Sequence, residues 1–218
     1  MISVFSKILE RQCVLKRHCY IFIHREAVIM ETKSEYFLDE IFELEAYGMF
    51  DDIKLSSFMI PFLMDFDEIR HKKAIDYITN VLKDYYSAGY LKVYISHEAT
   101  TMLGYALWFI NPAHEATYLH KIFVHEKYRN HGIGTGIMKS MCEISDNINL
   151  LCPSDKVEFY QRNGFRYIAS FEIPDNESFK LSKYLYSGLS VMTNSETAME
   201  APIFFLNDND LKAIVGVN

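Results

Sequence analysis

Apolar residues recur at helical spacing in several parts of the chain. Residues 35–47 carry them three and four positions apart, which predicts a helix that Gly48 ends. The same spacing predicts a second helix over residues 65–86, ended by Gly89, and a third over residues 132–144. The chain therefore alternates helical segments with the shorter apolar runs described next.

Short runs with alternating or continuous apolar side chains predict strands. These runs are residues 20–25, 90–96, 102–110, 118–124, 148–152, 167–171 and 189–193. A fourth helix is predicted between the last strands, because Asp155 and Glu158 have the spacing of a capping box and Gly164 is placed to end the helix. The order β-α-α-β-β-β-α-β-α-β-β predicts an α/β (α+β) domain with a mixed sheet.

The periodic segments divide the chain into three parts. Residues 20–193 are expected to form one domain, preceded by an N-terminal extension at 1–19 and followed by a C-terminal tail at 194–218. The tail contains the apolar run Ile203–Leu206, and such a run rarely stays bare. We expect it to pack back on the domain or to contribute to a homodimer contact.

Composition agrees with one folded domain. The chain has 218 residues, of which 50% are hydrophobic and 15% aromatic, enough for a sizeable core. The formal net charge of −7 argues against a general nucleic-acid binder. No stretch approaches a membrane span, charged residues interrupt the start of the chain where a signal peptide would be apolar, and four cysteines are too few for a disulfide scaffold. We expect a cytoplasmic protein with reduced thiols.

The segment from Val124 to Gly136 carries the most specific chemistry. A strand leads into a polar turn, then into closely spaced glycines and an amphipathic helix. Glycines let a backbone approach a phosphate, and the free N–H groups at a helix start favour negative charge. Arg129 can add a charge-assisted contact. The segment therefore predicts a phosphate site.

Three phosphate motifs compete for this segment. A P-loop needs Lys and then Ser or Thr directly after its last glycine, whereas Ile137 directly follows Gly136. A Rossmann fingerprint needs a third glycine where Ile137 stands. The pattern R-x-x-G-x-G is met by Arg129, Gly132 and Gly134.

A second motif follows downstream. The segment Val157–Phe165 contains the pattern F-Y-x-x-x-G-F. Together with R-x-x-G-x-G and the strand order, it resembles the GNAT superfamily of N-acetyltransferases, over about residues 20–193 and most strongly over 122–165. The resemblance implies a mixed, splayed central sheet flanked by helices. It also implies direct transfer of an acetyl group from acetyl-CoA to a primary amine in a ternary complex.

The resemblance assigns roles to individual residues. The backbone of Ile122, Phe123 and Val124 would pair with the pantetheine arm, and Tyr160 would be the general acid that protonates the leaving thiolate. The residues that would surround the pyrophosphate are Arg129, Asn130, His131, Gly132, Ile133, Gly134 and Thr135. For Tyr160, a packing role beside its aromatic neighbours is the alternative.

The general base is open. Many relatives have a Glu where this chain has Tyr118, and alternation places His120 on the same face as Tyr118 and Lys121 on the opposite face. Histidine changes charge near neutral pH, so His120 is the candidate base. Glu98, Glu115 and ordered water are the alternatives.

Other clusters give weaker signals. The N-terminal Cys and His residues (Cys13, Cys19, His18 and His24) lack a complete zinc spacing, so we expect no metal. Cys152 has no recognisable histidine partner and is interpreted as a wall residue. A set of acidic positions surrounds the first two helices and would suit a cationic acceptor, although a solvated helix face predicts the same pattern. These positions are Asp39, Glu40, Glu43, Glu45, Asp51, Asp52, Asp65, Asp67 and Glu68.

The sequence leaves three functions in competition. An N-acetyltransferase acting on a small-molecule or peptide amine is the first. A CoA-binding regulatory module with little or no turnover is the second, motivated by the unusual base position. A dinucleotide-binding protein is the third, motivated by the glycine cluster alone.

Overall fold

A six-stranded open sheet organises the protein. The computed structural model describes residues 31–173, 177–196 and 200–216, so the strand predicted at 20–25 and the N-terminal Cys and His residues lie outside the described residues. The strands are β1 (Leu91–Glu98), β2 (Thr101–Phe109), β3 (Thr117–Val124), β4 (Ile148–Pro153), β5 (Arg166–Ser170) and β6 (Leu189–Thr193). They lie in the order β1-β2-β3-β4-β6-β5, antiparallel except for the parallel pair β3–β4. The mixed sheet predicted from the sequence is confirmed.

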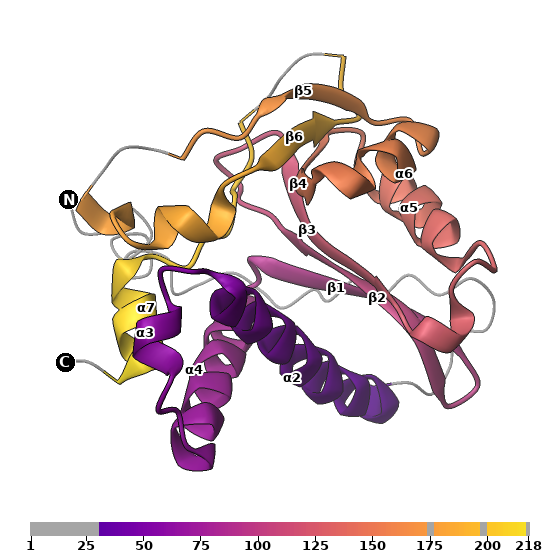
Figure 1. Cartoon of the computed structure of the whole chain (residues 1–218). Helices are drawn as coiled ribbons and strands as arrows, with labels where there is room; N and C mark the ends of the chain where they lie inside the picture. The colour runs from indigo at the N-terminus through magenta and orange to yellow at the C-terminus, as the bar shows by residue number, and fades with distance from the viewer. Residues whose placement is uncertain (1–30, 174–176, 197–199, 217–218) are drawn as a thin grey trace.

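Helices cover both faces of the sheet (Figure 1). They are α2 (Glu31–Leu55), α3 (Ile60–Leu63), α4 (Glu68–Ser87), α5 (Ile133–Ile144), α6 (Val157–Arg162) and α7 (Asp208–Val215), with single 3₁₀ turns at Glu126–Tyr128, Ser154–Lys156, Glu177–Phe179 and Ser182–Tyr186. One core gathers apolar residues of α2, α4 and α7 against one face, and a second gathers those of α5 and α6 against the other. No helix in the described ranges combines the length and hydropathy that a membrane span requires.

Two predicted helix boundaries are wrong. Helix α2 continues through Gly48 to Leu55, because Phe50 and Ile53 extend its buried stripe and packing outweighs the cost of one helical glycine. The predicted capping box is also absent. Asp155 lies in the 3₁₀ turn before α6, and its carboxylate accepts a hydrogen bond from Lys156 Nζ at 2.7 Å instead.

A β-bulge in β3 overturns the predicted alternation of its side chains. Leu107 pairs with Lys121, and the next residue of β2 pairs with Leu119, so His120 has no partner on β2. The extra residue turns both His120 and Lys121 towards α2, where both approach Glu45. Lys121 therefore does not lie opposite His120, as strict alternation predicts.

β3 and β4 pair over only three residues. Thr117 pairs with Ile148, and Leu119 with Leu150, after which no register joins the two strands. The strands splay beyond this point, and β3 remains paired to β2 as far as Val124. The prediction of a splayed sheet with residues 118–124 in its interior is confirmed.

The C-terminal segment packs into the first core. Phe204, Leu206, Leu211 and Ile214 are all buried there. The ring of Phe204 stacks on Phe109 of β2, with centroids 4.7 Å apart. Residues far along the chain thus complete the side of the sheet that α2 and α4 cover.

We predict that Phe204→Ala lowers the free energy of unfolding by about 3 kcal/mol, the lower end of the range for buried aromatic truncations. The ring is 7% exposed, so its removal leaves a cavity beside Phe109. Denaturant unfolding measures the change, and Phe62→Ala is the matched control because that ring is 50% exposed. Equal, small effects of the two substitutions would contradict the prediction.

Candidate functional site

A cavity of about 1410 Å³ occupies the region where β3 and β4 splay apart. Residues of α2, β3, the β3–α5 turn, β4, α6 and the C-terminal segment line it. The sequence-predicted site residues that line it are His120, Ile122, Phe123, Val124, Arg129, Asn130, Gly132, Ile133, Gly134, Thr135 and Tyr160. His131 does not line it; the ring of His131 is exposed, with Nδ1 2.7 Å from the carbonyl oxygen of Arg129. The structure thus brings together residues of both sequence motifs.

The turn between β3 and α5 is built by its own backbone. Arg129 Nε donates a hydrogen bond to the carbonyl oxygen of Val124 at 3.1 Å, which ties the turn to the end of the strand. Asn130 and Gly132 have φ values of 65° and 79°, in the left-handed region that favours residues with small or no side chains. This conformation directs the chain into α5.

The N-terminus of α5 faces the cavity with unpaired donors. Its N-cap is Gly132, which has no side chain to cap the helix, and the first intrahelical bond runs from Gly136 N–H to the Gly132 carbonyl. The N–H groups of Ile133, Gly134 and Thr135 therefore have no intrahelical partner. Together with the helix dipole, these N–H groups have the geometry and polarity that suit an anion such as a phosphate.

Tyr160 enters the cavity from α6. Its ring packs edge-on against Phe159, with centroids 5.1 Å apart, and Phe165 lies on another side. Burial, and to a lesser degree the nearby Cys152, raises the pKa of the Tyr160 hydroxyl. The phenol therefore keeps its proton at neutral pH and can donate it to a developing anion.

Cys152 lines the cavity beside Tyr160 but is poorly suited to attack. Burial, with a contribution from Asp155, raises the pKa of its thiol to about 11. Its sulfur donates to the sulfur of Met192 at 3.6 Å. Because the thiolate is the nucleophilic form, these properties favour the wall residue inferred from the sequence.

A buried carboxylate lies on the α2 side of the cavity. Glu45 is 2% exposed, and Tyr105 Oη donates a hydrogen bond to its Oε2 at 3.3 Å. His120 Nε2 lies 3.4 Å from Glu45 Oε1, and Lys121 Nζ lies 3.8 Å from the same oxygen. Burial raises the pKa of Glu45, but the His120 contact and the Lys121 charge outweigh it and lower the pKa below its usual value. Glu45 is therefore ionised.

From the sequence alone, Glu45 is one acidic position among several around the first two helices, a pattern that a solvated helix face explains equally well. A finer signal was present, because Glu45 follows Phe37 and Ile41 at intervals of four and so lies on the apolar stripe of α2. The other predicted base candidates, Glu98 and Glu115, do not line the cavity.

The C-terminal part of the chain closes this side of the cavity. Tyr186 Oη accepts a hydrogen bond from the Leu206 N–H at 2.7 Å and donates one to the Leu206 carbonyl at 3.3 Å. Phe204 and Asp52 also line the cavity, and burial is the main cause that raises the pKa of Asp52. Sequence motifs do not reveal these neighbours, because they come from segments far apart in the chain.

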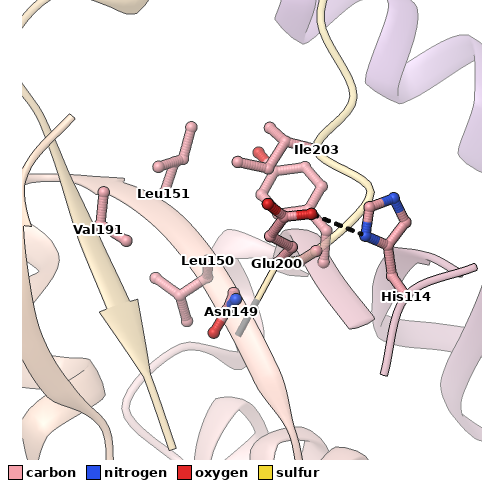
Figure 2. A pocket seen from close by; sticks show the side chains of 9 residues that line it. His114, Asn149, Leu150, Leu151, Val191, Glu200 and Ile203 are labelled. Carbon is pink, nitrogen blue, oxygen red and sulfur yellow. Dashed lines mark ion pairs between the residues drawn. The ribbon is translucent and has the colours of Figure 1, made fainter. Parts of the chain in front are cut away.

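A second cavity of about 270 Å³ lies beside β4 and β6 (Figure 2). Glu200 and His114 both line it, and the dashed line in Figure 2 joins His114 Nδ1 to Glu200 Oε2, 3.9 Å apart. Tyr118 and Leu151 line both cavities, so the two adjoin. None of the residues that the sequence assigned to catalysis or acetyl-CoA lies in it. Within the described residues, no group of three His, Cys, Asp or Glu side chains is placed to hold a metal ion.

Comparison with known families identifies one match. Residues 89–167 match the model of the acetyltransferase (GNAT) domain family. This segment runs from the turn before β1 into β5 and contains the R-x-x-G-x-G motif and the F-Y-x-x-x-G-F motif. The family resemblance drawn from these motifs is confirmed. No curated protein sequence matches the chain.

Several solved structures are similar to the chain at low sequence identity. A GNAT-family protein from Desulfovibrio desulfuricans is 14% identical, with a TM-score of 0.45 over 73% of this chain and 90% of that one. A mutant of the spermidine N-acetyltransferase from Vibrio cholerae is 15% identical, with a TM-score of 0.42 over 55% and 73%. An acetyltransferase from Thermus thermophilus is 13% identical, with a TM-score of 0.43 over 55% and 73%. Support for acetyl transfer comes from the family match.

We predict that Gly134→Val abolishes binding of acetyl-CoA. A β-carbon at Gly134 would lie 3.5 Å from the Phe159 ring and 3.8 Å from Val124, so the larger Val side chain crowds the first turn of α5. A pyrophosphate could then no longer approach the free N–H groups. Titration calorimetry with acetyl-CoA measures the loss.

Gly136→Val is the matched control for this substitution. Gly136 lies in the same helix, does not line the cavity, and has nothing within 4 Å of an added β-carbon. We expect this variant to bind acetyl-CoA as the wild type does. If Gly134→Val also binds as tightly as the wild type, the pyrophosphate lies elsewhere.

Proposed function

We propose that this protein, which carries a GNAT acetyltransferase domain over residues 89–167, transfers an acetyl group from acetyl-CoA directly to a primary amine. One observation carries the proposal. A single cavity connects the start of α5, the protonated phenol of Tyr160 and the Glu45–His120 pair. A phosphate-bearing donor and an amine acceptor can therefore meet within it.

The splay between β3 and β4 suits the pantetheine arm. Beyond Leu119, the edge of β3 that faces β4 has no strand partner, and Ile122, Phe123 and Val124 lie along this edge. Their free backbone groups can pair with the amides of pantetheine, as strand addition pairs a peptide with a sheet edge. The pyrophosphate would then reach the turn from Arg129 to Thr135, and the thioester would lie near Tyr160.

The reaction needs a base and an acid. An alkyl amine has an ordinary pKa of about 10.4, so removing its proton near pH 7 costs about 4–5 kcal/mol. Solvent takes the first proton of the ammonium group, and His120 accepts the second proton as the amine nitrogen forms a bond to the thioester carbon. When the carbon–sulfur bond breaks, Tyr160 donates its proton to the departing thiolate. Solvent then carries the proton from His120 back to Tyr160.

The proposed domain bounds remain residues 20–193. The tail at 194–218 supplies Phe204 and Leu206 to the acceptor side of the cavity. The acceptor amine therefore lies between α2 and the C-terminal segment, where Glu45 and Asp52 favour a cationic group.

A screen of amine acceptors tests the function. Purified protein is incubated with acetyl-CoA and a panel of small-molecule and peptide amines, and release of the free thiol is followed. We expect at least one amine to accelerate release and to be recovered with an added acetyl group. Tight binding of acetyl-CoA without transfer to any amine would instead support a CoA-binding regulatory module, and tighter binding of NAD than of acetyl-CoA would support a dinucleotide-binding protein.

We predict that Tyr160→Phe lowers kcat by about 10²-fold, the lower end of the range for general acid catalysis. The substitution keeps the ring that packs on Phe159 and removes only the proton donor. Binding of acetyl-CoA and thermal stability should change little.

The control for this prediction is Tyr167→Phe. Tyr167 is 46% exposed in β5, and its hydroxyl contacts Ser170 rather than the cavity. Full kcat in Tyr160→Phe, measured where chemistry limits the rate, would show that Tyr160 only packs. A loss of folding in place of turnover would point to the same conclusion.

A further inference from the structure

We propose that Glu45 is a positioning residue that holds His120 in one tautomer, with the proton on Nε2 and the lone pair on Nδ1 left to accept the proton of the acceptor amine. The inference rests on the proposed function, in which His120 accepts the amine proton. It adds a residue of α2, outside the segment 89–167 that matches the GNAT family, to the machinery of the reaction.

The β3 bulge is what brings the two residues together. In a regular strand, neighbours such as His120 and Lys121 point to opposite faces. Here both side chains reach Glu45 Oε1, because His120 is the extra residue that has no partner on β2. At the bulge, β3 lacks one pairing with β2, and two side chains that can donate hydrogen bonds lie near the Glu45 carboxylate.

The partners of Glu45 indicate that the His120 imidazole acts as a hydrogen-bond donor to this carboxylate. An ionised carboxylate only accepts hydrogen bonds. Tyr105 donates to Oε2, so Oε1 faces the His120 Nε2 at 3.4 Å and the Lys121 ammonium at 3.8 Å. The favourable arrangement at this contact has Nε2 protonated. Nδ1 is then the nitrogen with the lone pair.

The Nδ1 atom of His120 is buried and lacks a hydrogen-bond partner among the described residues. Within the described residues, neither ring nitrogen has a partner with full hydrogen-bond geometry, although Nε2 lies at ion-pair distance from Glu45. The rings of Phe109, Tyr118 and Phe204 surround the imidazole, with centroids 5.5–5.9 Å away, and none of them supplies a group that pairs with Nδ1. Because the His120 side chain is 15% exposed and lines the cavity, a small rotation of the ring brings the buried Nδ1 to a bound amine, which then supplies the missing partner.

The same arrangement stabilises the protonated ring. When Nδ1 takes the proton of the amine, the imidazole becomes a cation that remains in contact with the Glu45 carboxylate. A carboxylate with this role orients the histidine and favours the charge that develops on it, without itself taking the proton. Glu45 thus acts through His120 and needs no contact with the substrate.

The first test reads the tautomer without turnover. Nitrogen-15 chemical shifts of the imidazole distinguish protonation at Nε2 from protonation at Nδ1, and the His120 signals are assigned by their loss in His120→Gln. We expect the Nε2–H form in the neutral wild-type ring. In Glu45→Gln, the amide can donate to Nε2, so we expect the Nδ1–H form to increase. An Nδ1–H form in the wild type, or no change in Glu45→Gln, would overturn the proposal.

The second test separates positioning from packing. We expect Glu45→Gln to lower kcat by about 10²-fold, with the KM for acetyl-CoA unchanged, and to have no further effect in a His120→Gln background. Glu43→Gln is the matched control, because Glu43 is an exposed carboxylate on the same helix. Full kcat in folded Glu45→Gln, or effects that add in the double variant, would contradict the proposal.

The two tests also distinguish this proposal from the proposed function. If the wild type transfers acetyl groups to no amine, the function fails, while the nitrogen-15 shifts still decide how Glu45 holds His120. Should Glu45→Gln fail to fold, the wild-type tautomer alone decides, and Tyr105→Phe, which removes one hydrogen bond to Glu45 but leaves its carboxylate an acceptor, should retain the Nε2–H form.

Discussion

The early end of pairing between β3 and β4 is the constraint on which the rest of the site depends. The two parallel strands share a register from Thr117 to Leu119 on β3 and then diverge. Inside a sheet, backbone N–H and C=O groups without a strand partner need another one. Divergence therefore creates a slot with polar edges in the interior of the domain, where a covered core would otherwise lie. Both sequence motifs border this slot, since one follows β3 and the other follows β4.

The bulge at His120 is the local counterpart of that divergence. It lies at the first residue of β3 beyond the paired region. A bulge increases the local twist of its strand, which favours separation from the neighbour on the other edge. The same extra residue places Lys121 beside His120 on the α2 side. The bulge thus lies where the slot between β3 and β4 opens, and it places a charged side chain on the α2 side of that slot.

Periodicity and glycine spacing predicted most of the fold. The strands, the helix after Gly132 and the turn from Arg129 to Thr135 all depend on interactions between residues close in sequence, so local patterns reveal them. Local patterns do not reveal the bulge. It depends on the register in which β2 and β3 pair, and the apolar pattern of β2 is compatible with a regular register as well as with a bulged one. The helix end predicted at Gly48 is wrong for a similar reason. A glycine favours a helix end through its own backbone freedom, whereas the tertiary packing of Phe50 and Ile53 continues α2.

The burial of Glu45 is not explained by local sequence patterns or by stability. A buried ion pair contributes little net stability, because removing its charges from water costs about as much as their attraction returns. Apolar residues of similar volume on the stripe of α2 would serve the core equally well, as Ile41 does one turn earlier. The carboxylate instead lies where three donors from β2 and β3 converge, at the wall of the cavity that holds Tyr160 on another side. A charge that core stability does not require, in contact with the one histidine that lines the cavity among the described residues, agrees with the proposed role of Glu45 in setting the tautomer of that histidine.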